Sequence, residues 1–272
     1  MKDIVLRSIS GFVFVAILVA SIALWDGVCV KYVLGLFSGL ALYEFYQMLK
    51  VKNIHLSPFT FIGTGLGIYT LFVCCDWEKM LYSVFFSTAI LLIFWVVELW
   101  RKKGNPLEII AYGTFGLMYC VFPFIAMVWV HSIHEPALLY MFIVVWTNDT
   151  FAYLAGRAFG KHKLFERISP KKTWEGTIGG IIASVTVALL MQHFLDPYWL
   201  SYWIGGIIAV VIGAIFGDLF ESLIKRSLGV KDSGNIIPGH GGVLDRFDAA
   251  MFAAPLLLIW LPLYIMFFNL FS

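Results

Sequence analysis

The sequence predicts an all-α, polytopic integral membrane protein with about nine transmembrane helices. Of its 272 residues, 61% are hydrophobic and only 13% are charged, a balance too apolar for soluble domains of this length. Apolar stretches of about 18 residues or more recur along the chain, and the positive charges gather between alternate stretches. These observations exclude a soluble enzyme, and a net charge of +2 gives no argument for a nucleic-acid partner.

The nine expected spans are separated by polar or charged segments. In chain order they cover residues 4–24, 30–48, 58–75, 81–98, 108–131, 137–155, 177–195, 200–220 and 249–270. The first could imitate a signal peptide, but its length and the lack of a small-x-small cleavage site predict a retained span. Pro123, Pro255 and Pro262 lie inside the fifth and ninth spans, where they predict kinks rather than breaks. The sixth and eighth spans run into polar residues at their C-terminal ends.

The charges of the loops predict the orientation. Nine spans put the termini on opposite sides of the membrane. With the N-terminus inside, 17 of the 19 Lys and Arg residues fall on the inside, which leaves only Lys31 and Lys79 outside. Because short loops rich in Lys and Arg stay on the cytoplasmic side, we expect a cytoplasmic N-terminus in a multi-pass protein of the inner (plasma) membrane of the cell.

Polar residues are concentrated in the second half of the chain. The sequence therefore divides into an N-terminal region, residues 1–132 with about five spans, and a C-terminal catalytic region, residues 133–272 with about four. The second region contains two long inside loops, 156–176 and 221–248, whereas most outside connections are a few residues long. We expect the chemistry at the cytoplasmic face, in these loops and the spans that enter them.

A first polar cluster lies where the sixth span ends, in TNDTFAYLAGRAFG. On a helix, Asn148, Asp149, Ala152, Tyr153 and Gly156 would share one face. An aspartate within a span costs about 2.5–3.5 kcal/mol on insertion scales. This cost favours a polar cavity around the aspartate, and an interfacial aspartate paired with a nearby arginine or lysine is the alternative.

The segment SPKKTWEG follows this cluster and begins the next span. Lysines flanked by hydroxyls at a helix start suit a phosphate, through charge-assisted hydrogen bonds and the helix dipole. The alternative is a basic loop that only fixes the orientation. The small-residue spacing Gly176-x-x-x-Gly180 predicts close packing of the helix that follows. The hydroxyls and lysines are Ser169, Lys171, Lys172 and Thr173.

A second polar cluster begins at the end of the eighth span, in GAIFGDLFESLIKRS. Gly213 and Gly217 would let another helix approach closely just before the first acid. The polar residues fall at i, i+3, i+4 and i+7, so they form one stripe of a helix that enters the cytoplasm. These residues are Asp218, Glu221, Ser222 and Lys225.

The cluster continues after a Gly-rich passage with His240, Asp245 and Asp248, directly before the last span. Carboxylates from the end of one span and the start of another can meet at one depth. There, hard oxygen ligands would bind Mg²⁺ and leave positions for phosphates. Asp218 and Asp245 are predicted to face each other as the main ligands. Helix capping by Asp245 and Asp248 is the alternative, but it does not explain the Gly-Gly pair or the opposing Asp218.

The segment from Ser222 to Asp248, SLIKRSLGVKDSGNIIPGHGGVLDRFD, resembles the signature of the phosphatidate cytidylyltransferases, or CDP-diacylglycerol synthases. The shared pattern is Ser-x-x-Lys-Arg, Lys-Asp, Pro-Gly-His-Gly-Gly and Asp-Arg-x-Asp, and it holds over the whole segment. GRAFGKHKLFERISPKKTWEG, from Gly156 to Gly176, resembles the second characteristic segment of that family. Two long motifs in the order of the family make the resemblance specific, whereas the N-terminal half adds only its hydropathy.

The resemblance implies that CTP and phosphatidate give CDP-diacylglycerol and pyrophosphate, with Mg²⁺ and, in some members, K⁺. The acyl chains of phosphatidate would stay in the bilayer while CTP arrives from the cytoplasm, and Gly-rich helix faces permit a homodimer. The expected catalytic residues are Asp218, Asp245, Lys225 and Arg246. The expected substrate-binding residues are Ser169, Lys171, Lys172, Thr173, Arg226 and His240. The expected metal ligands are Asp218 and Asp245, with Asp248, Glu221 and Asp149 for a second ion or for support of the first.

Two other classes of protein share parts of this pattern. A transporter or channel also places acids within the membrane, but here the polar groups gather at one face, without a polar path to the other. Another CTP-using membrane enzyme, such as a polyprenol kinase or a synthase acting on ether-linked lipids, is closer. Its signature should differ between Ser222 and Asp248.

Overall fold

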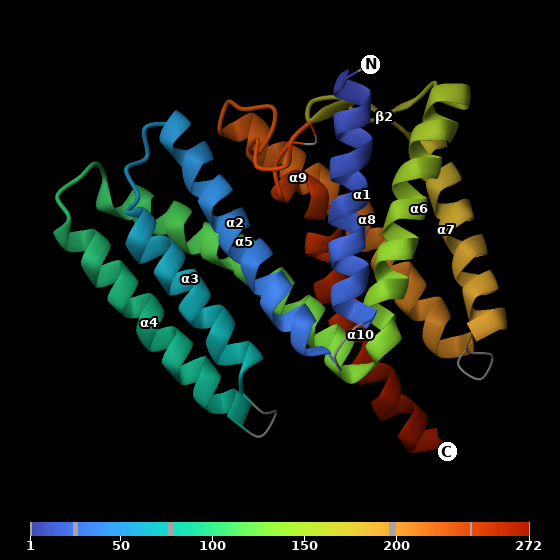
Figure 1. The fold of residues 1–272 in the computed structure, drawn as a ribbon, viewed down its shortest axis with the longest axis horizontal. Helices are drawn as coiled ribbons and strands as arrows, with labels where there is room; N and C mark the ends of the chain where they lie inside the picture. Colours follow the sequence, from blue (N-terminus) through green and yellow to red (C-terminus); the bar gives the residue numbers. More distant parts are fainter. Residues whose placement is uncertain (1, 24–26, 76–78, 196–199, 240, 272) are drawn as a thin grey trace. The chain divides into compact units, whose positions relative to one another are not determined.

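The computed structural model describes every residue except 1, 24–26, 76–78, 196–199, 240 and 272. The described part of the chain forms ten helices and two short strands (Figure 1). These elements make two compact units that alternate along the sequence: Met1–Trp129 with Lys225–Arg246, and Val130–Ile224 with Phe247–Ser272. Most of the second long loop therefore groups with the N-terminal helices, and we describe each unit by itself.

The first unit is built from helices that satisfy their backbone hydrogen bonds internally, as the interior of a membrane requires. They are α1 Lys2–Ala23, α2 Val28–Val51, α3 Pro58–Val73, α4 Met80–Trp100 and most of α5 Pro106–Ile133. Consecutive helices pack together, α1 on α2, α2 on α3 and α3 on α4 (Figure 1). At the start of α3, Ser57 is extended and Pro58 occupies the first turn, where its missing N–H costs nothing.

Aromatic side chains fill the core of the first unit. Phe45, Phe61 and Phe94 are among its largest fully buried residues, and the rings of Phe45 and Phe61 lie 6.3 Å apart. Gly116 on α5 makes this packing possible, because a Cβ there would lie 2.5 Å from the ring of Phe45. The helices thus approach each other through small residues, as expected in a membrane, where hydrophobicity does not drive helix association.

Hydrogen bonds tie the segment Lys225–Arg246 to the N-terminal helices. Lys52, just after the end of α2, donates from Nζ to the backbone oxygen of Ser227 at 3.2 Å. The hydroxyl of Ser10 on α1 donates to the backbone oxygen of Pro238 at 2.8 Å. The segment is held by α1 and α2, which lie far from it in sequence.

The second unit contains α6 Glu135–Phe159, α7 Trp174–Leu195, most of α8 Leu200–Ser227 and α10 Ala250–Phe271. The short helix α9 Leu244–Phe247, which belongs to the first unit except for its last residue, precedes α10. Helix α6 packs against α7 and α10 (Figure 1). As predicted for Gly213, another helix approaches closely there, since a Cβ would lie 2.5 Å from the Cα of Ala253 on α10.

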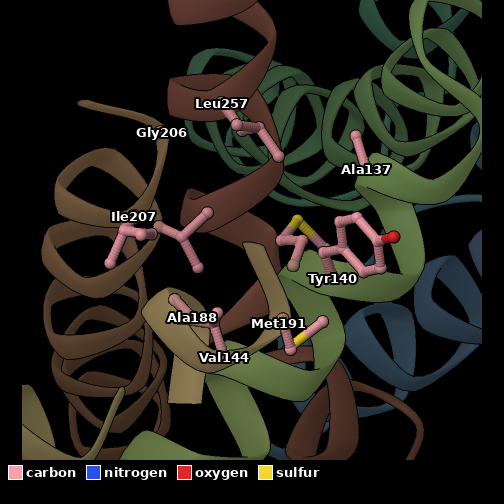
Figure 2. A pocket seen from close by; sticks show the side chains of 10 residues that line it. Ala137, Tyr140, Val144, Ala188, Met191, Gly206, Ile207 and Leu257 are labelled. Carbon is pink, nitrogen blue, oxygen red and sulfur yellow. The ribbon is translucent and has the colours of Figure 1, made fainter. Parts of the chain in front are cut away.

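A small apolar cavity of about 20 Å³ lies between helices of this unit. Its side chains come from α6, α7, α8 and α10 and turn toward one another (Figure 2). A space of this size and polarity offers water too few partners, so it belongs to the packed core. The lining residues are Ala137, Tyr140, Met141, Val144, Ala188, Met191, Gly206, Ile207, Val210 and Leu257.

The nine apolar segments predicted from the sequence all form helices, and α5 and α10 continue through their prolines. In the described residues, six helices are long and apolar enough to cross a membrane: α2, α4, α5, α6, α7 and α8. Helices α1, α3 and α10 contain shorter apolar stretches, Ile9–Ala23, Pro58–Val73 and Ala250–Leu263. The class of an all-α multi-pass membrane protein is confirmed, and the count of nine spans stays a prediction.

The structure adds a β-hairpin that the sequence did not predict. In the loop after α6, β1 Lys163–Phe165 pairs antiparallel with β2 Ser169–Thr173. Both strands are short, and Lys163, Lys171 and Pro170 interrupt the apolar alternation that normally indicates strands. The hairpin presents the SPKKT segment in an extended form directly before α7.

Candidate active site

A polar cavity of about 440 Å³ lies within the second unit. The five residues predicted to share a face of the sixth span all line it: Asn148, Asp149, Ala152, Tyr153 and Gly156. The prediction that Asp149 lies in a polar cavity is therefore confirmed. Lysines from β2 line the same cavity as Asp149. The remaining polar lining residues are Arg157, Lys171, Lys172, Thr173, Thr177 and Asp218.

Two glycines on α7 form the close contact that shapes this cavity. A Cβ on Gly176 would lie 2.7 Å from the backbone oxygen of Ala152, and one on Gly180 would lie 2.7 Å from Oδ1 of Asn148. The predicted Gly176-x-x-x-Gly180 motif thus packs α7 directly on α6. Thr173 caps the start of α7, where its Oγ1 accepts the N–H of Gly176 at 3.2 Å.

Carboxylates from α6, α8 and the turn before α10 interact in the second unit. Gly217 on α8 leaves room for the residues before α10, since a Cβ there would lie 2.4 Å from the backbone oxygen of Asp248. Burial raises the pKa of Asp248 well above its ordinary value, and the negative charges of Asp218, Glu221 and Asp149 raise it further. The predicted meeting of acids from the end of α8 and the start of α10 therefore occurs for Asp218 and Asp248.

Lys172 supplies the positive charge closest to Asp218. The two side chains form an ion pair in which both are partly exposed, and Asp218 also accepts the hydroxyl of Ser222 at 3.4 Å. Oδ1 of Asn148 is buried and has no hydrogen-bond partner among the described residues. The cavity thus combines carboxylates and lysines, which suits a cation together with a phosphate.

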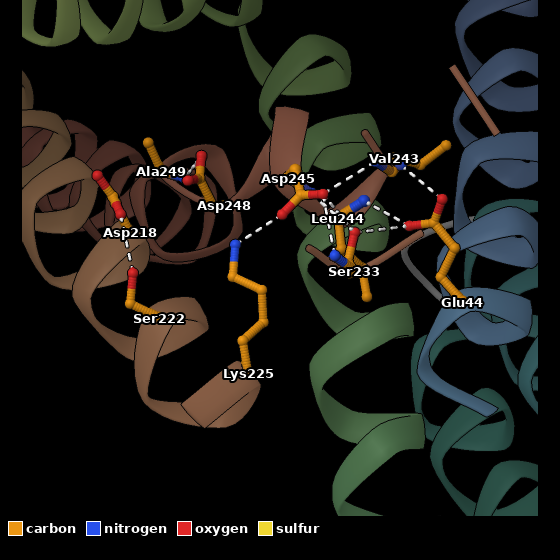
Figure 3. A network of polar contacts seen from close by, with 11 residues as sticks. Glu44, Asp218, Ser222, Lys225, Ser233, Val243, Leu244, Asp245, Asp248 and Ala249 are labelled. Carbon is orange, nitrogen blue, oxygen red and sulfur yellow. Dashed lines mark hydrogen bonds and ion pairs between the residues drawn. The ribbon is translucent and has the colours of Figure 1, made fainter. Parts of the chain in front are cut away.

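The first unit holds a second polar network, centred on Asp245 of α9 (Figure 3). Its Oδ1 accepts the ammonium of Lys225 at 2.6 Å. Its Oδ2 accepts the backbone N–H of Ser233 at 3.0 Å and that of Gly242 at 2.9 Å. The hydroxyl of Ser233 lies 2.9 Å from the same oxygen and 3.1 Å from Oε2 of Glu44. Lys225 and Asp245, both predicted as catalytic, are thus in direct contact.

The environment of Asp245 keeps its side chain ionised. Burial alone would raise the pKa of Asp245, but the hydrogen bond and charge of Lys225, with the N–H groups of Gly242 and Ser233, outweigh it and lower the pKa below its ordinary value. The carboxylate is therefore a fixed negative charge. Its ion-pair partner in this network is Lys225.

A polar cavity of about 450 Å³ adjoins this network in the first unit, and Asp245 and Arg246 line it together with Asp232 and Asn235. Arg226 and Arg246 are exposed. Ser169 opens β2, where it pairs with Phe165. His240, predicted to bind substrate, lies outside the described residues.

The predicted metal ligands divide between the units. Asp149, Asp218, Glu221 and Asp248 belong to the second, and Asp245 belongs to the first. In the part of the chain that the structure describes, no three His, Cys, Asp or Glu side chains are close enough to form a ready-made metal site. The pairing of Asp218 with Asp245 stays a prediction.

A family model connects this geometry with known proteins. The model described as the cytidylyltransferase family matches residues 5–264. The chain belongs to the cytidylyltransferase family. This assignment confirms the resemblance found in the two motifs, and it extends over the N-terminal helices, for which hydropathy was the only signal.

Curated relatives of this cytidylyltransferase carry a more specific name. A phosphatidate cytidylyltransferase of Staphylococcus haemolyticus is 37% identical over 82% of this chain and 86% of its own. That of Haemophilus influenzae is 33% identical over 92% of this chain and 95% of its own. One of Staphylococcus epidermidis reaches 49% identity over 46% of this chain and 48% of its own.

Sequence reasoning missed Glu44 of the cytidylyltransferase, which lies in α2 and is 1% exposed. It accepts the backbone N–H of Val243 at 2.7 Å and that of Leu244 at 2.9 Å. A signal was present, because an acid inside an apolar span is by default a candidate functional residue.

Proposed function

We propose that this cytidylyltransferase transfers the cytidylyl group of CTP to phosphatidate, giving CDP-diacylglycerol and pyrophosphate for phospholipid synthesis. The observation that carries the proposal is the polar cavity of the second unit, in which Lys171 and Lys172 lie beside Asp149 and Asp218. Lysines among acids suit a polyphosphate that arrives with a cation. The names of the relatives supply phosphatidate as the acceptor.

The reaction is a displacement at phosphorus. A phosphate oxygen of phosphatidate forms a bond to the α-phosphorus of CTP, and the bond from that phosphorus to the pyrophosphate oxygen breaks. Phosphatidate already carries a negative oxygen, so no strong general base is needed. The tasks of the protein are to bring two anions together and to stabilise charge on the leaving pyrophosphate.

The residues of this chain would share these tasks. Lys171 and Lys172 would hold phosphate oxygens in the cavity of the second unit, while Lys225, Arg226 and Arg246 would do so in the first. Ser169, Thr173 and His240 are candidates for weaker hydrogen bonds to substrate. The hydroxyl of Thr173 already caps α7. We therefore expect replacement of Thr173 to affect folding more than substrate binding.

Mg²⁺ fits the donor set of the second unit. The carboxylates of Asp149, Asp218 and Asp248 are the hard ligands that this ion prefers, and they would draw together around it. When bound, Mg²⁺ would neutralise phosphate charge and polarise the reacting phosphoryl group. Glu221 and, in the first unit, Asp245 are further candidate ligands, and K⁺ remains part of the proposal through the family resemblance.

The membrane context of the proposal follows from the charges of the loops. We infer an inner-membrane protein with a cytoplasmic N-terminus and a site open to the cytoplasm. Phosphatidate would enter from the bilayer with its acyl chains still in lipid. A homodimer stays a prediction, because the close-packed glycines of α7 and α8 contact helices or loops of the same chain.

The direct test is to incubate purified protein in lipid nanodiscs with α-labelled CTP, phosphatidate and Mg²⁺. We expect lipid-extractable label and pyrophosphate in equal amounts, and none when diacylglycerol replaces phosphatidate. The rival kinase is tested separately with a polyprenol and γ-labelled CTP, because a kinase transfers the γ-phosphoryl group to the polyprenol and releases CDP. Turnover with the polyprenol alone, or no CDP-lipid at any salt concentration, would reject the proposal.

A further inference from the structure

We propose that Glu44 is a positioning residue for Asp245, acting through Ser233 and the backbone of residues 242–244. The inference rests on the proposed function in so far as it treats Asp245 as part of the active site. Glu44 lies on α2, about 200 residues before the segment that it contacts, in the half of the chain for which only hydropathy had been informative. All of the groups involved belong to the first unit.

Glu44 holds this segment by three short contacts. Its Oε1 accepts the N–H of Val243, and its Oε2 accepts the N–H of Leu244 (Figure 3). Oε2 also lies within hydrogen-bonding distance of the hydroxyl of Ser233. Two consecutive backbone donors on one carboxylate fix both the position and the rotation of the chain just before Asp245.

The glycines of the motif are shaped around the same carboxylate. A Cβ on Gly242 would lie 2.5 Å from Oε2 of Glu44, and one on Gly234 would lie 2.9 Å from its Oε1. Gly241 has φ +83°, and a Cβ there would lie 2.7 Å from Oδ2 of Asp245. The Gly-Gly pair, which helix capping could not explain, thus allows Glu44 and Asp245 to approach the loop from two sides.

Ser233 connects the two carboxylates. Its hydroxyl is within reach of Oε2 of Glu44 and Oδ2 of Asp245, while it accepts the N–H of Asp245 at 3.3 Å. One hydroxyl proton can serve only one carboxylate at a time, so Ser233 couples their orientations. Oδ2 of Asp245 is held by this loop, and Oδ1 remains directed at Lys225.

Stability alone does not account for a carboxylate at this place. Burying a charge carries a desolvation penalty that its hydrogen bonds largely offset, and a well-packed apolar side chain is often as stable. What the carboxylate adds is geometry, since directed bonds determine where the loop lies. A misplacement of about 1 Å can cost roughly 10²-fold in rate, which makes such an anchor valuable beside a charged catalytic pair.

The primary experiment measures hydrogen exchange of the peptide covering residues 233–247 in nanodiscs without substrate. Glu44→Gln keeps the volume but places an amide against backbone donors, so we expect the amides of Val243 and Leu244 to exchange at least about tenfold faster. Glu98→Gln is the matched control. Glu98 is also 1% exposed in the first unit, but it pairs with Arg101 and Thr60. Loss of its charge should therefore leave the exchange rates of the peptide 233–247 unchanged.

Kinetics separates positioning from general destabilisation. We expect Glu44→Gln to lower kcat by roughly 10- to 100-fold while KM for CTP changes by less than about threefold, because substrate binding groups remain. Ser233→Ala should also lower kcat. The double variant should be no more than about twofold worse than the worse single variant, since both act through one network.

Unchanged exchange at residues 243 and 244, or multiplicative kinetic losses in the double variant, would overturn the inference. If Glu44→Gln does not give folded protein, Glu44→Asp is measured instead, since it keeps the charge but withdraws the carboxylate by one methylene. Exchange requires no substrate. A wild-type protein that made no CDP-lipid would reject the proposed function, and normal exchange in the variant would reject the role of Glu44.

Discussion

Asp218 and Asp248 approach each other because Gly217 has no side chain. The backbone oxygen of Asp248 occupies the space that a Cβ would need, and the charge of Asp218 helps to raise the pKa of Asp248. Lys172 offsets part of this negative charge through its ion pair with Asp218. A carboxylate surrounded by acids and one lysine attracts a further cation, so Asp218 is the residue most sensitive to loss of charge.

Asp218→Asn should lower turnover by roughly 10²–10³-fold, because the isosteric amide cannot provide the charge that a cation and Lys172 require. Asp245→Asn should have an effect of similar size through the loss of its contact with Lys225. CDP-lipid formation measures the effect, and membrane insertion with the thermal unfolding profile checks the fold. Glu166→Gln, at an exposed site between the two strands, is the control and should retain full activity. Near-normal turnover of Asp218→Asn would remove this residue from the site.

Single residues also mark the limit of what the sequence could predict. Asp149, Lys171, Lys172 and Asp218 were all predicted as site residues, and they line one cavity. Adjacent segments of the chain predicted Asp149, Lys171 and Lys172 together, whereas Asp218 joins them only through tertiary packing. Glu44 could not be assigned to the loop in this way, because its partners lie about 200 residues away and no periodic pattern connects them.

At the scale of elements, the packing of α6 on α7 shapes the polar cavity of the second unit. Gly180→Ala would place a methyl group 2.7 Å from Oδ1 of Asn148 and 2.8 Å from its backbone oxygen. Because backbone must move to relieve this contact, we expect a loss of about 1–3 kcal/mol in stability and lower activity. Gly63→Ala is the matched control, since a Cβ on Gly63 of α3 meets nothing within 4 Å.

Thermal unfolding in detergent would compare the stability of the two glycine variants. The Gly63 variant should melt at the wild-type temperature or slightly above it, because alanine favours a helix over glycine. Equal melting of both variants would show that α6 and α7 tolerate separation here. Activity in nanodiscs would then show whether the cavity depends on their contact.

Helices were predicted more completely than the connections between them. An apolar segment in a membrane has to satisfy its own backbone hydrogen bonds, so hydropathy alone predicted nine helices. The ends were less certain. α6 extends to Phe159 and α8 to Ser227, beyond the expected ends at 155 and 220, because polar residues continue a helix readily once it leaves the apolar layer. The β-hairpin lacked a periodic pattern, and only its contacts define it.

At the scale of the whole molecule, the order of the chain does not follow the two compact units. Residues Lys225–Arg246 group with the N-terminal helices, and the division of the chain at residue 132 stays a prediction. Hydrogen bonds with Ser10, Lys52 and Glu44 join this segment to the N-terminal helices. The N-terminal helices therefore contribute directly to one of the two polar networks.

The charges of the loops predict how the whole chain is oriented in the membrane, and labelling can test this prediction. Native cysteines are useful probes, because Cys74 is exposed and Cys29 and Cys75 are partly exposed, all at the ends of spans expected outside. A membrane-impermeant maleimide should label wild-type protein in intact cells. With these cysteines replaced by serine, Lys163→Cys on the exposed hairpin strand should be labelled only after permeabilisation. Labelling of Lys163→Cys in intact cells would reverse the orientation and place the polar cavity of the second unit on the side that lacks CTP.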